Sequence, residues 1–452
     1  MHQTHTLQEK CKLLFSILLP ILVTELATYA MNFIDTVMSG QAGTDQLAGV
    51  AIGSSLWVPI FTGLTGIILG LTPIISQLIG ADHADRVAYP LLQAIYLSIV
   101  IGLIVIGLGT IFLEPILQGL NVTPSVQSIA TGYLATLAVG ILPLFIYTAI
   151  RCFIDALGQT RVTMIMTLVS LPVNAVLNYM FIFGHFGAPA LGGVGAGAAS
   201  ALTYWLIMII ALYIVIRVEP FRDYQVFTKL YRVSIKAWSD HLKLGLPIGF
   251  SIFFETSIFS AVTFFMSDYS TVVLAAHQAA INFESFLYMP PFSISMALTI
   301  AVGFEVGAGR HRDAIHYSYL GMGAAVLLAV MFSGLLYLFN DSVARIYSQN
   351  PEVITMTAHF LIYAIFFQLS DAIAAPLQGA LRGYKDVNMT FVVALISYWL
   401  IGLPSGYLIA HYTQFGPFGY WIGLSIGLTA GAVCLFIRLL VLQSRHRMPQ
   451  SS

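Results

Sequence analysis

Long apolar runs separated by short polar segments dominate the chain. Residues 87–113, 162–216 and 387–437 contain no Asp, Glu, Lys or Arg. A helix needs about 20 apolar residues to cross a bilayer, so the first run fits one span and each of the other two fits two. The run 162–216 is broken at 184–189, GHFGAP, whose residues are typical of a turn. The pattern predicts an all-α integral membrane protein.

Runs that are interrupted by a single acid bring the prediction to twelve transmembrane helices. Their centres lie near residues 26, 65, 102, 142, 172, 205, 255, 290, 327, 368, 398 and 428. The composition agrees, because 58% of the residues are hydrophobic and only 9% are charged, whereas soluble domains carry about 25% charge. A net charge of −1 gives no basic field for nucleic acid, so we expect no nucleic-acid partner.

The Lys and Arg residues predict how the chain is oriented. If the N-terminus lies inside, every Lys and Arg except Arg345 falls in or beside a segment on the inner side, with Arg151 the loosest member. Lys and Arg concentrate on the cytoplasmic side of membrane proteins. We therefore expect a multi-pass protein of the inner (plasma) membrane, surrounded by the lipid bilayer, with both termini in the cytoplasm.

The two halves of the chain resemble each other at a nearly fixed offset. Leu19-Pro20-Ile21 recurs as Leu246-Pro247-Ile248, and further matches follow in the same order. Each half holds six predicted spans, an even number, so both halves insert in the same orientation, as in transporters built from parallel repeats. We expect two pseudo-symmetric six-helix bundles, residues 1–217 and 238–452, joined by a polar cytoplasmic linker at 218–237.

Acids without an evident partner are the main candidates for function. The acids inside predicted helices are Glu25, Asp35, Glu255, Glu284 and Asp371. A charged side chain at the bilayer centre costs about 2.5–3.5 kcal/mol on insertion scales, and no base lies at comparable depth except Arg151. These acids must then be protonated, bind a metal cation or face an aqueous cavity.

Helical periodicity groups the acids with other polar residues. At 100° per residue, Glu25, Thr28, Asn32 and Asp35 share one face of the first helix. Four further polar stripes follow on later helices: Asn174 with Asn178, Ser251 with Glu255, His277 with Glu284 and Tyr288, and Gln368 with Asp371 and Gln378. Single polar residues in membrane helices more often form hydrogen bonds to a neighbouring helix than contacts to a substrate. We therefore base the functional hypothesis on the acids.

Motifs of known enzyme chemistry are missing from the sequence. It contains no GxxxxGK[ST] loop for ATP, no HExxH and no CxxC, and its three cysteines are scattered. The glycine-rich LGGVGAGAA at 191–199 follows no predicted strand, so it predicts close helix packing and not a dinucleotide loop. We therefore expect a protein that is not an enzyme and uses no cofactor apart from a coupling ion.

Several stretches resemble the multidrug and toxic compound extrusion (MATE) family, and its bacterial NorM-like branch in particular. The resemblance covers essentially the whole chain. It is carried by NFIDTVMSG at 32–40, LAGVAIGSSLWVP at 47–59, PVNAVLNYMFIFG at 172–184, AAHQAAINFESFLYMPPFSISMALTIAVGFEVGAG at 275–309 and LQGALRGYKD at 377–386. It implies the MATE fold, two six-helix bundles, and a secondary active efflux transporter that exchanges H⁺ or Na⁺ for cationic, amphiphilic small molecules. We expect it to act as a monomer.

The resemblance also assigns residues to two cation-coupling sites. Asp35, Asn174 and Asn178 match the family's site in the N-terminal bundle. Glu255 and Asp371 match the site in the C-terminal bundle, with Tyr288 as an aromatic neighbour. Glu25, Glu284 and Ser200 are additional candidates, Ser200 if its helix turns it inward.

The coupling ion stays open between H⁺ and Na⁺. Na⁺ would need several oxygens, at Asp35 or at Glu255 and Asp371, whereas a proton needs one suitable carboxylate. Phe367 and Asn350 stand where some Na⁺-coupled relatives carry Tyr and Asp, and Glu25 stands where Gln is commoner, so H⁺ is slightly favoured. The alternatives are a flippase for lipids or lipid-linked oligosaccharides of the same superfamily and, with less support, an intramembrane enzyme.

Overall fold

The computed structural model describes residues 1–447 and contains only helices and connections in that range. Contacts divide the chain into two compact units, and each is described by itself. Eleven helices are long and apolar enough to cross a membrane, or twelve when the pair Pro124–Ala138 and Ile141–Ala156, bent by 49°, counts as one span. The predicted all-α membrane fold with about twelve spans is confirmed.

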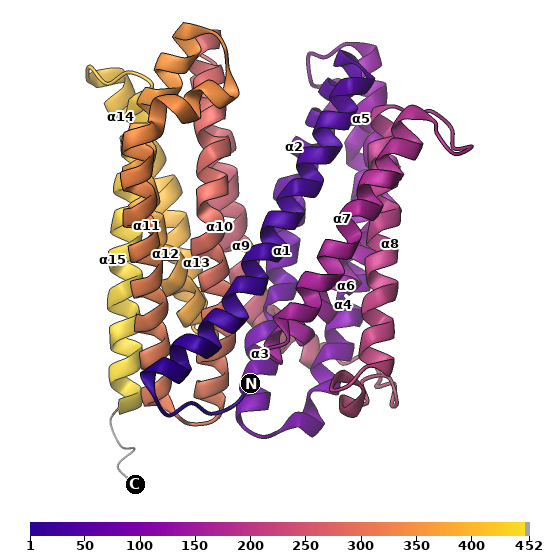
Figure 1. Cartoon of the computed structure of the whole chain (residues 1–452), viewed down its shortest axis with the longest axis vertical. Helices are drawn as coiled ribbons and strands as arrows, with labels where there is room; N and C mark the ends of the chain where they lie inside the picture. Colours follow the sequence, from indigo (N-terminus) through magenta and orange to yellow (C-terminus); the bar gives the residue numbers. More distant parts are fainter. Residues whose placement is uncertain (448–452) are drawn as a thin grey trace. The chain divides into compact units, whose positions relative to one another are not determined.

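One unit comprises Leu19–Leu246. Its helices are α1 (Leu7–Ala42, from residue 19), α2 (Thr44–Leu69), α3 (Leu71–Gly80), η1 (Ala84–Arg86), α4 (Ala88–Gln118), α5 (Pro124–Ala138), α6 (Ile141–Ala156), α7 (Thr160–Phe183), α8 (Gly193–Arg217), η2 (Phe221–Tyr224) and the start of α9 (Ile235–Met266). α8 contacts α5, α6 and α7 (Figure 1). The core contains Phe145, Phe153 and Leu71, all fully buried.

The other unit joins Met1–Leu18 to the chain from Pro247 onward. Its helices are α9 (from residue 247), α10 (Thr271–Gly307), α11 (His311–Tyr347), α12 (Pro351–Gly383), α13 (Asn388–Ala394), the π-helical η3 (Leu395–Gly402), α14 (Leu403–Tyr412) and α15 (Phe418–Arg447). α12 contacts α10, α11 and α15 (Figure 1). Trp421, Phe360 and Phe367 lie in its core.

Both α1 and α9 change unit at positions related by the sequence repeat, namely between residues 18 and 19 and between 246 and 247. The first residues stay with the second half because the Lys10 ammonium lies 2.9 Å from Asp313 Oδ1. The start of α9 stays with the first half because the His241 ring bonds the Ile67 carbonyl at 2.8 Å. The unit boundaries defined by contacts, at residues 18/19 and 246/247, thus differ from the boundaries expected from the repeat. The repeat predicted bundles at 1–217 and 238–452 with a linker at 218–237.

Local sequence explains where helices begin and how closely they pack. Thr123, Ser270 and Asn350 each accept a backbone N–H with the side chain, which caps α5, α10 and α12. The glycines at 191–199 open α8, and a Cβ at Gly197 would collide with the carbonyl of Tyr133 on α5. Close packing is the role that the sequence predicted for this stretch.

Candidate functional site

Asp35 on α1 is the centre of a hydrogen-bond network that reaches α7 and α8. Asn178 Nδ2 donates to Asp35 Oδ1 at 2.5 Å, and Ser200 Oγ donates to Asp35 Oδ2 at 3.1 Å. The carboxylate is 9% exposed, and no Lys or Arg forms an ion pair with it in the described part of the chain. Two neutral donors therefore hold a buried acid without balancing its charge.

The same network leaves an amide oxygen without a partner. Asn178 Nδ2 also donates to Asn174 Oδ1 at 3.1 Å, and Asn174 Nδ2 donates to Thr203 Oγ1 at 3.4 Å. Asn178 Oδ1 is buried and accepts no hydrogen bond from any described residue. Because carboxylate, amide and hydroxyl oxygens gather within one network, this site can hold a proton on Asp35 or offer oxygens to a hard cation.

Glu25 lies in a different environment from Asp35, although both belong to α1. Arg151 on α6 reaches Glu25 Oε1 at 2.9 Å and Asp155 Oδ2 at 3.3 Å, and Thr163 Oγ1 donates to Asp155 Oδ1 at 2.6 Å. Arg151 is the exception that the sequence left open, and it is the partner of Glu25. Glu25 is therefore not an unpaired acid, and this cluster joins α1, α6 and α7.

Glu255 on α9 is bonded to α12. Gln378 Nε2 donates to Glu255 Oε1 at 2.6 Å. Arg382, one turn further along α12, is 5% exposed and interacts electrostatically with Glu255. Besides Arg151, a second base is therefore buried inside the protein near a candidate acid. No ion pair links the two groups among the described residues.

Glu284, Asp371 and Tyr288 lie in the same region of this unit. Glu284 on α10 is 4% exposed, and neither of its oxygens has a hydrogen-bond partner among the described residues. It interacts electrostatically with Asp371, which in turn interacts with Glu255 and Tyr288. Gln368, one turn before Asp371, is 1% exposed, and its side-chain amide has no described partner either. The region therefore contains buried polar groups, Glu284 and Gln368, that have no hydrogen-bond partner among the described residues.

Other polar residues from the predicted stripes do not join these two groups of acids. Thr28 donates to the carbonyl of Thr24 in its own helix, and Asn32 is exposed. His277 is held by Trp421 at 3.0 Å and Thr263 at 3.1 Å. Within residues 1–447, no three Asp, Glu, His or Cys side chains approach closely enough to hold a metal ion. The C-terminal acids therefore do not form a three-carboxylate metal cluster.

The comparison with known families matches the duplication seen in the sequence. The MatE family model matches residues 20–180 and again residues 247–408, so its two copies begin at the repeated prolines Pro20 and Pro247. The chain belongs to the MATE family. Its similarity to NorM proteins places it in the NorM-like branch of MATE transporters, and it is therefore a transporter and not an enzyme.

Two bacterial proteins illustrate this similarity. The probable multidrug resistance protein NorM of Oceanobacillus iheyensis is 58% identical over 445 residues, which are 98% of this chain and 100% of that protein. The protein of the same name from Bacillus subtilis is 54% identical over 450 residues, 100% of both chains.

Solved structures show that the MATE fold extends over nearly the whole chain. The eukaryotic MATE transporter AtDTX14 has a TM-score of 0.86 at 21% identity and covers 97% of this chain and 98% of its own. A multidrug resistance MATE family transporter described in an outward-facing conformation has a TM-score of 0.87 at 18% identity, with 97% of both chains covered. At these identities the likeness establishes the fold.

The structure brings together Asp35, Asn174, Asn178 and Ser200, as expected from their positions. It adds Thr203, Gln368, Gln378 and Arg382, which the sequence did not single out as site residues. The only feature of the sequence that pointed to Gln378 was its place on a predicted polar stripe with Asp371. Arg382 had no signal, because basic residues near a helix end usually reach the membrane surface.

Proposed function

We propose that this MATE protein is a secondary active transporter that expels cationic, amphiphilic compounds from the cell in exchange for an ion. The observation that carries the proposal is that each unit buries a carboxylate without an ion-paired base. Asp35 is buried in one unit, and Glu284 is buried in the other, where it interacts with the half-buried Asp371. A buried carboxylate that can gain and lose a mobile positive ion is the element that couples export to an ion gradient.

We propose H⁺ as the coupling ion. The oxygens of Asp35 already accept hydrogen bonds from Asn178 and Ser200, so a proton can join this network with little rearrangement. A Na⁺ ion needs several oxygen ligands, whereas Asn178 presents its amide nitrogen to the carboxylate. In the other unit the three acids do not form a shared metal cluster. One carboxylate suffices for a proton.

The multidrug character is supported by the relatives, which are named probable multidrug resistance proteins. A cationic substrate suits acidic sites, whereas a phosphate-bearing flippase substrate would favour basic ones. Arg151, the base inside the first unit, is already paired with Glu25 and Asp155. Arg382, the base buried in the other unit, lies close enough to Glu255 to interact with its carboxylate. We propose an inner-membrane location with both termini in the cytoplasm from the Lys and Arg distribution, and a monomer as the active form.

Purified protein in sealed vesicles tests the proposal. A pH gradient in Na⁺-free buffer should drive a fluorescent organic cation across the membrane, and collapse of the gradient by a protonophore should stop it. Transport that is absent there but starts on addition of a Na⁺ gradient at constant pH would show that Na⁺ is the coupling ion. Transport of a fluorescent lipid but no cation under either gradient would favour the flippase.

A further inference from the structure

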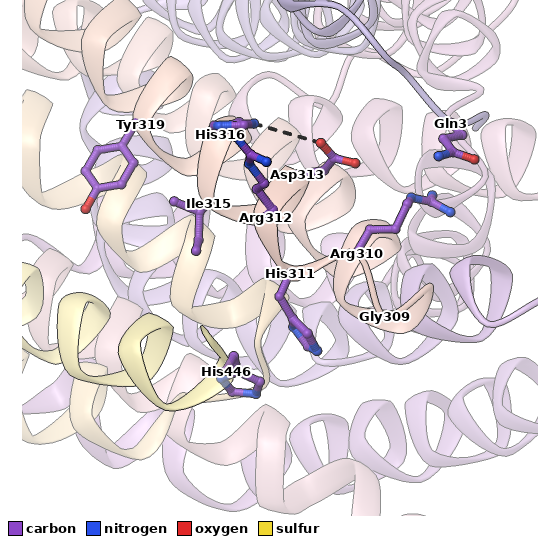
Figure 2. Close-up of a pocket in the computed structure, with 10 residues that line it drawn as sticks. All are labelled: Gln3, Gly309, Arg310, His311, Arg312, Asp313, Ile315, His316, Tyr319 and His446. Carbon is purple, nitrogen blue, oxygen red and sulfur yellow. Dashed lines mark ion pairs between the residues drawn. The ribbon is translucent and has the colours of Figure 1, made fainter. Parts of the chain in front are cut away.

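A cavity of about 1050 Å³ lies where α10 turns into α11, in the unit that contains the N-terminal segment (Figure 2). Its ionisable lining residues are Arg310, His311, Arg312, Asp313, His316 and His446. None of them belongs to the candidate ion sites. The lining is thus dominated by cationic groups and groups that can become cationic, with Asp313 as the one acid among the described residues that line it.

The single acid of this cavity is already engaged. Asp313 Oδ1 lies 2.9 Å from the Lys10 ammonium and 3.8 Å from His316 Nδ1. Lys10 is itself buried and also donates to the carbonyl of Thr4 at 2.9 Å. The charge of Asp313 is therefore balanced by Lys10 and does not cancel those of the arginines.

Two side-chain nitrogens next to the cavity have no hydrogen-bond partner among the described residues. Arg310 Nε is bound to Glu305 at 2.5 Å, but its Nη2 is buried without a partner among the described residues. His311 Nδ1 is in the same state, and its ring lies 4.7 Å from the ring of His446. Arg312 is exposed and forms no ion pair within residues 1–447. The exposed Arg312, which has no ion pair, and the exposed His316 therefore give the cavity a surface that can attract an anion.

The exposed face of α11 next to the cavity indicates which kind of anion the cavity would bind. Arg312, His316, Tyr319, Gly323, Val326 and Val330 follow at spacings of four and three residues, so they share one helix face. All six are exposed. A Cβ at Gly323 would meet no atom within 4 Å, so the stripe is open at that point. It runs from a cationic end to an apolar one, as the surface of an anionic phospholipid runs from phosphate to acyl chain.

We propose that this cavity binds the phosphate group of an anionic phospholipid, with an acyl chain along the α11 stripe. The exposed side chains of Arg312 and His316 contact the phosphate. Basic pockets at the cytoplasmic ends of membrane helices recognise anionic headgroups in this way. The choice of leaflet rests on the orientation proposed above, but the binding itself does not rest on transport.

Thermal unfolding of the full-length protein in neutral detergent measures the binding. Dioctanoyl phosphatidylglycerol should raise the unfolding temperature and saturate, while dioctanoyl phosphatidylcholine at equal concentration should leave it unchanged. The variant Arg312→Gln with His316→Gln should need about tenfold more phosphatidylglycerol for half of the shift, as expected for lost hydrogen bonds to a charged group. Arg345→Gln removes an exposed arginine from the other end of α11 and should respond like the wild type.

Three results would overturn the proposal. They are equal shifts with the two lipids, an unchanged half-saturation in the Arg312 and His316 variant, and an equal loss in Arg345→Gln. An arm with potassium phosphate at matched ionic strength separates the two sources of phosphate, because a shift as large as that with phosphatidylglycerol would assign the cavity to free phosphate. Native mass spectrometry of bound phosphatidylglycerol gives a second readout, in which the wild type and Arg345→Gln retain the lipid and the double variant loses it.

Discussion

The side-chain amide of Asn178 on α7 donates to Asp35 on α1 at 2.5 Å, across 143 positions of sequence. Asn178 uses its second amide hydrogen on Asn174, so its orientation is set by two acceptors at once. A change in the charge of Asp35 therefore acts on α7 directly. If the proposed coupling holds, this bond is where ion occupancy of Asp35 would act on the packing of α1 against α7.

Asp35→Asn should abolish ion-driven export while the protein still folds. The new side chain keeps an oxygen for Asn178 and gains a donor toward Ser200, so the free energy of unfolding should change by about 1 kcal/mol or less. The neutral amide cannot release a proton, and turnover should stop with some drug binding retained. Efflux of a fluorescent cation from vesicles measures this, with Thr36→Ala, an exposed residue of α1 that bonds a carbonyl of its own helix, as the control. Wild-type efflux by Asp35→Asn would make this site dispensable.

Glu255→Gln should also stop ion-driven export at normal expression. Gln378 can still bond the amide at position 255, so α9 and α12 should stay in contact. Adding Gln378→Glu to this variant restores one carboxylate within the same hydrogen-bonded pair and should restore part of the transport. Drug resistance of cells measures both variants, and Glu352→Gln, which removes an exposed acid at the start of α12, is the matched control. Normal resistance with Glu255→Gln alone would contradict the assignment.

Arg151→Met should destabilise the protein more than Glu25→Gln does. Loss of Arg151 leaves the buried carboxylate of Asp155 and the partly exposed carboxylate of Glu25 without their base, and a buried charge left unpaired costs about 3 kcal/mol or more. Glu25→Gln leaves Arg151 paired with Asp155, so its cost should be smaller and its transport should persist. Thermal unfolding and vesicle efflux separate the two effects. A fully stable but transport-dead Glu25→Gln would show that Glu25 acts in coupling.

Glu284→Met should raise the unfolding temperature and lower transport. Both carboxyl oxygens of Glu284 are buried without a described partner, and an unmet buried polar group costs about 1–3 kcal/mol. A methionine of similar length removes that cost, but it also removes a group that can carry a proton beside Asp371. Unfolding temperature and efflux, measured on the same preparation, test both parts. If efflux is unchanged, Glu284 serves packing alone.

The membrane fold could be read from the sequence because its causes are local. A span is a run of about 20 apolar residues, and the orientation depends on where Lys and Arg stand. The duplication is visible in the repeated Leu-Pro-Ile at residues 19–21 and 246–248, where the two copies of the MatE match also begin. Helical periodicity also put Asn174 and Asn178 on one face of α7, and both are buried there.

Partners across helices were decided only by tertiary structure. Glu25 and Asp35 share a face of α1, yet Glu25 meets Arg151 and Asp35 meets Asn178 and Ser200. Likewise, Arg382 and Arg312 are both basic residues near helix ends, but one is buried near Glu255 and the other is exposed beside a cavity. Periodicity gives the direction of a side chain on its own helix. Which helix lies opposite, and at what depth, depends on packing between segments that are far apart in the chain.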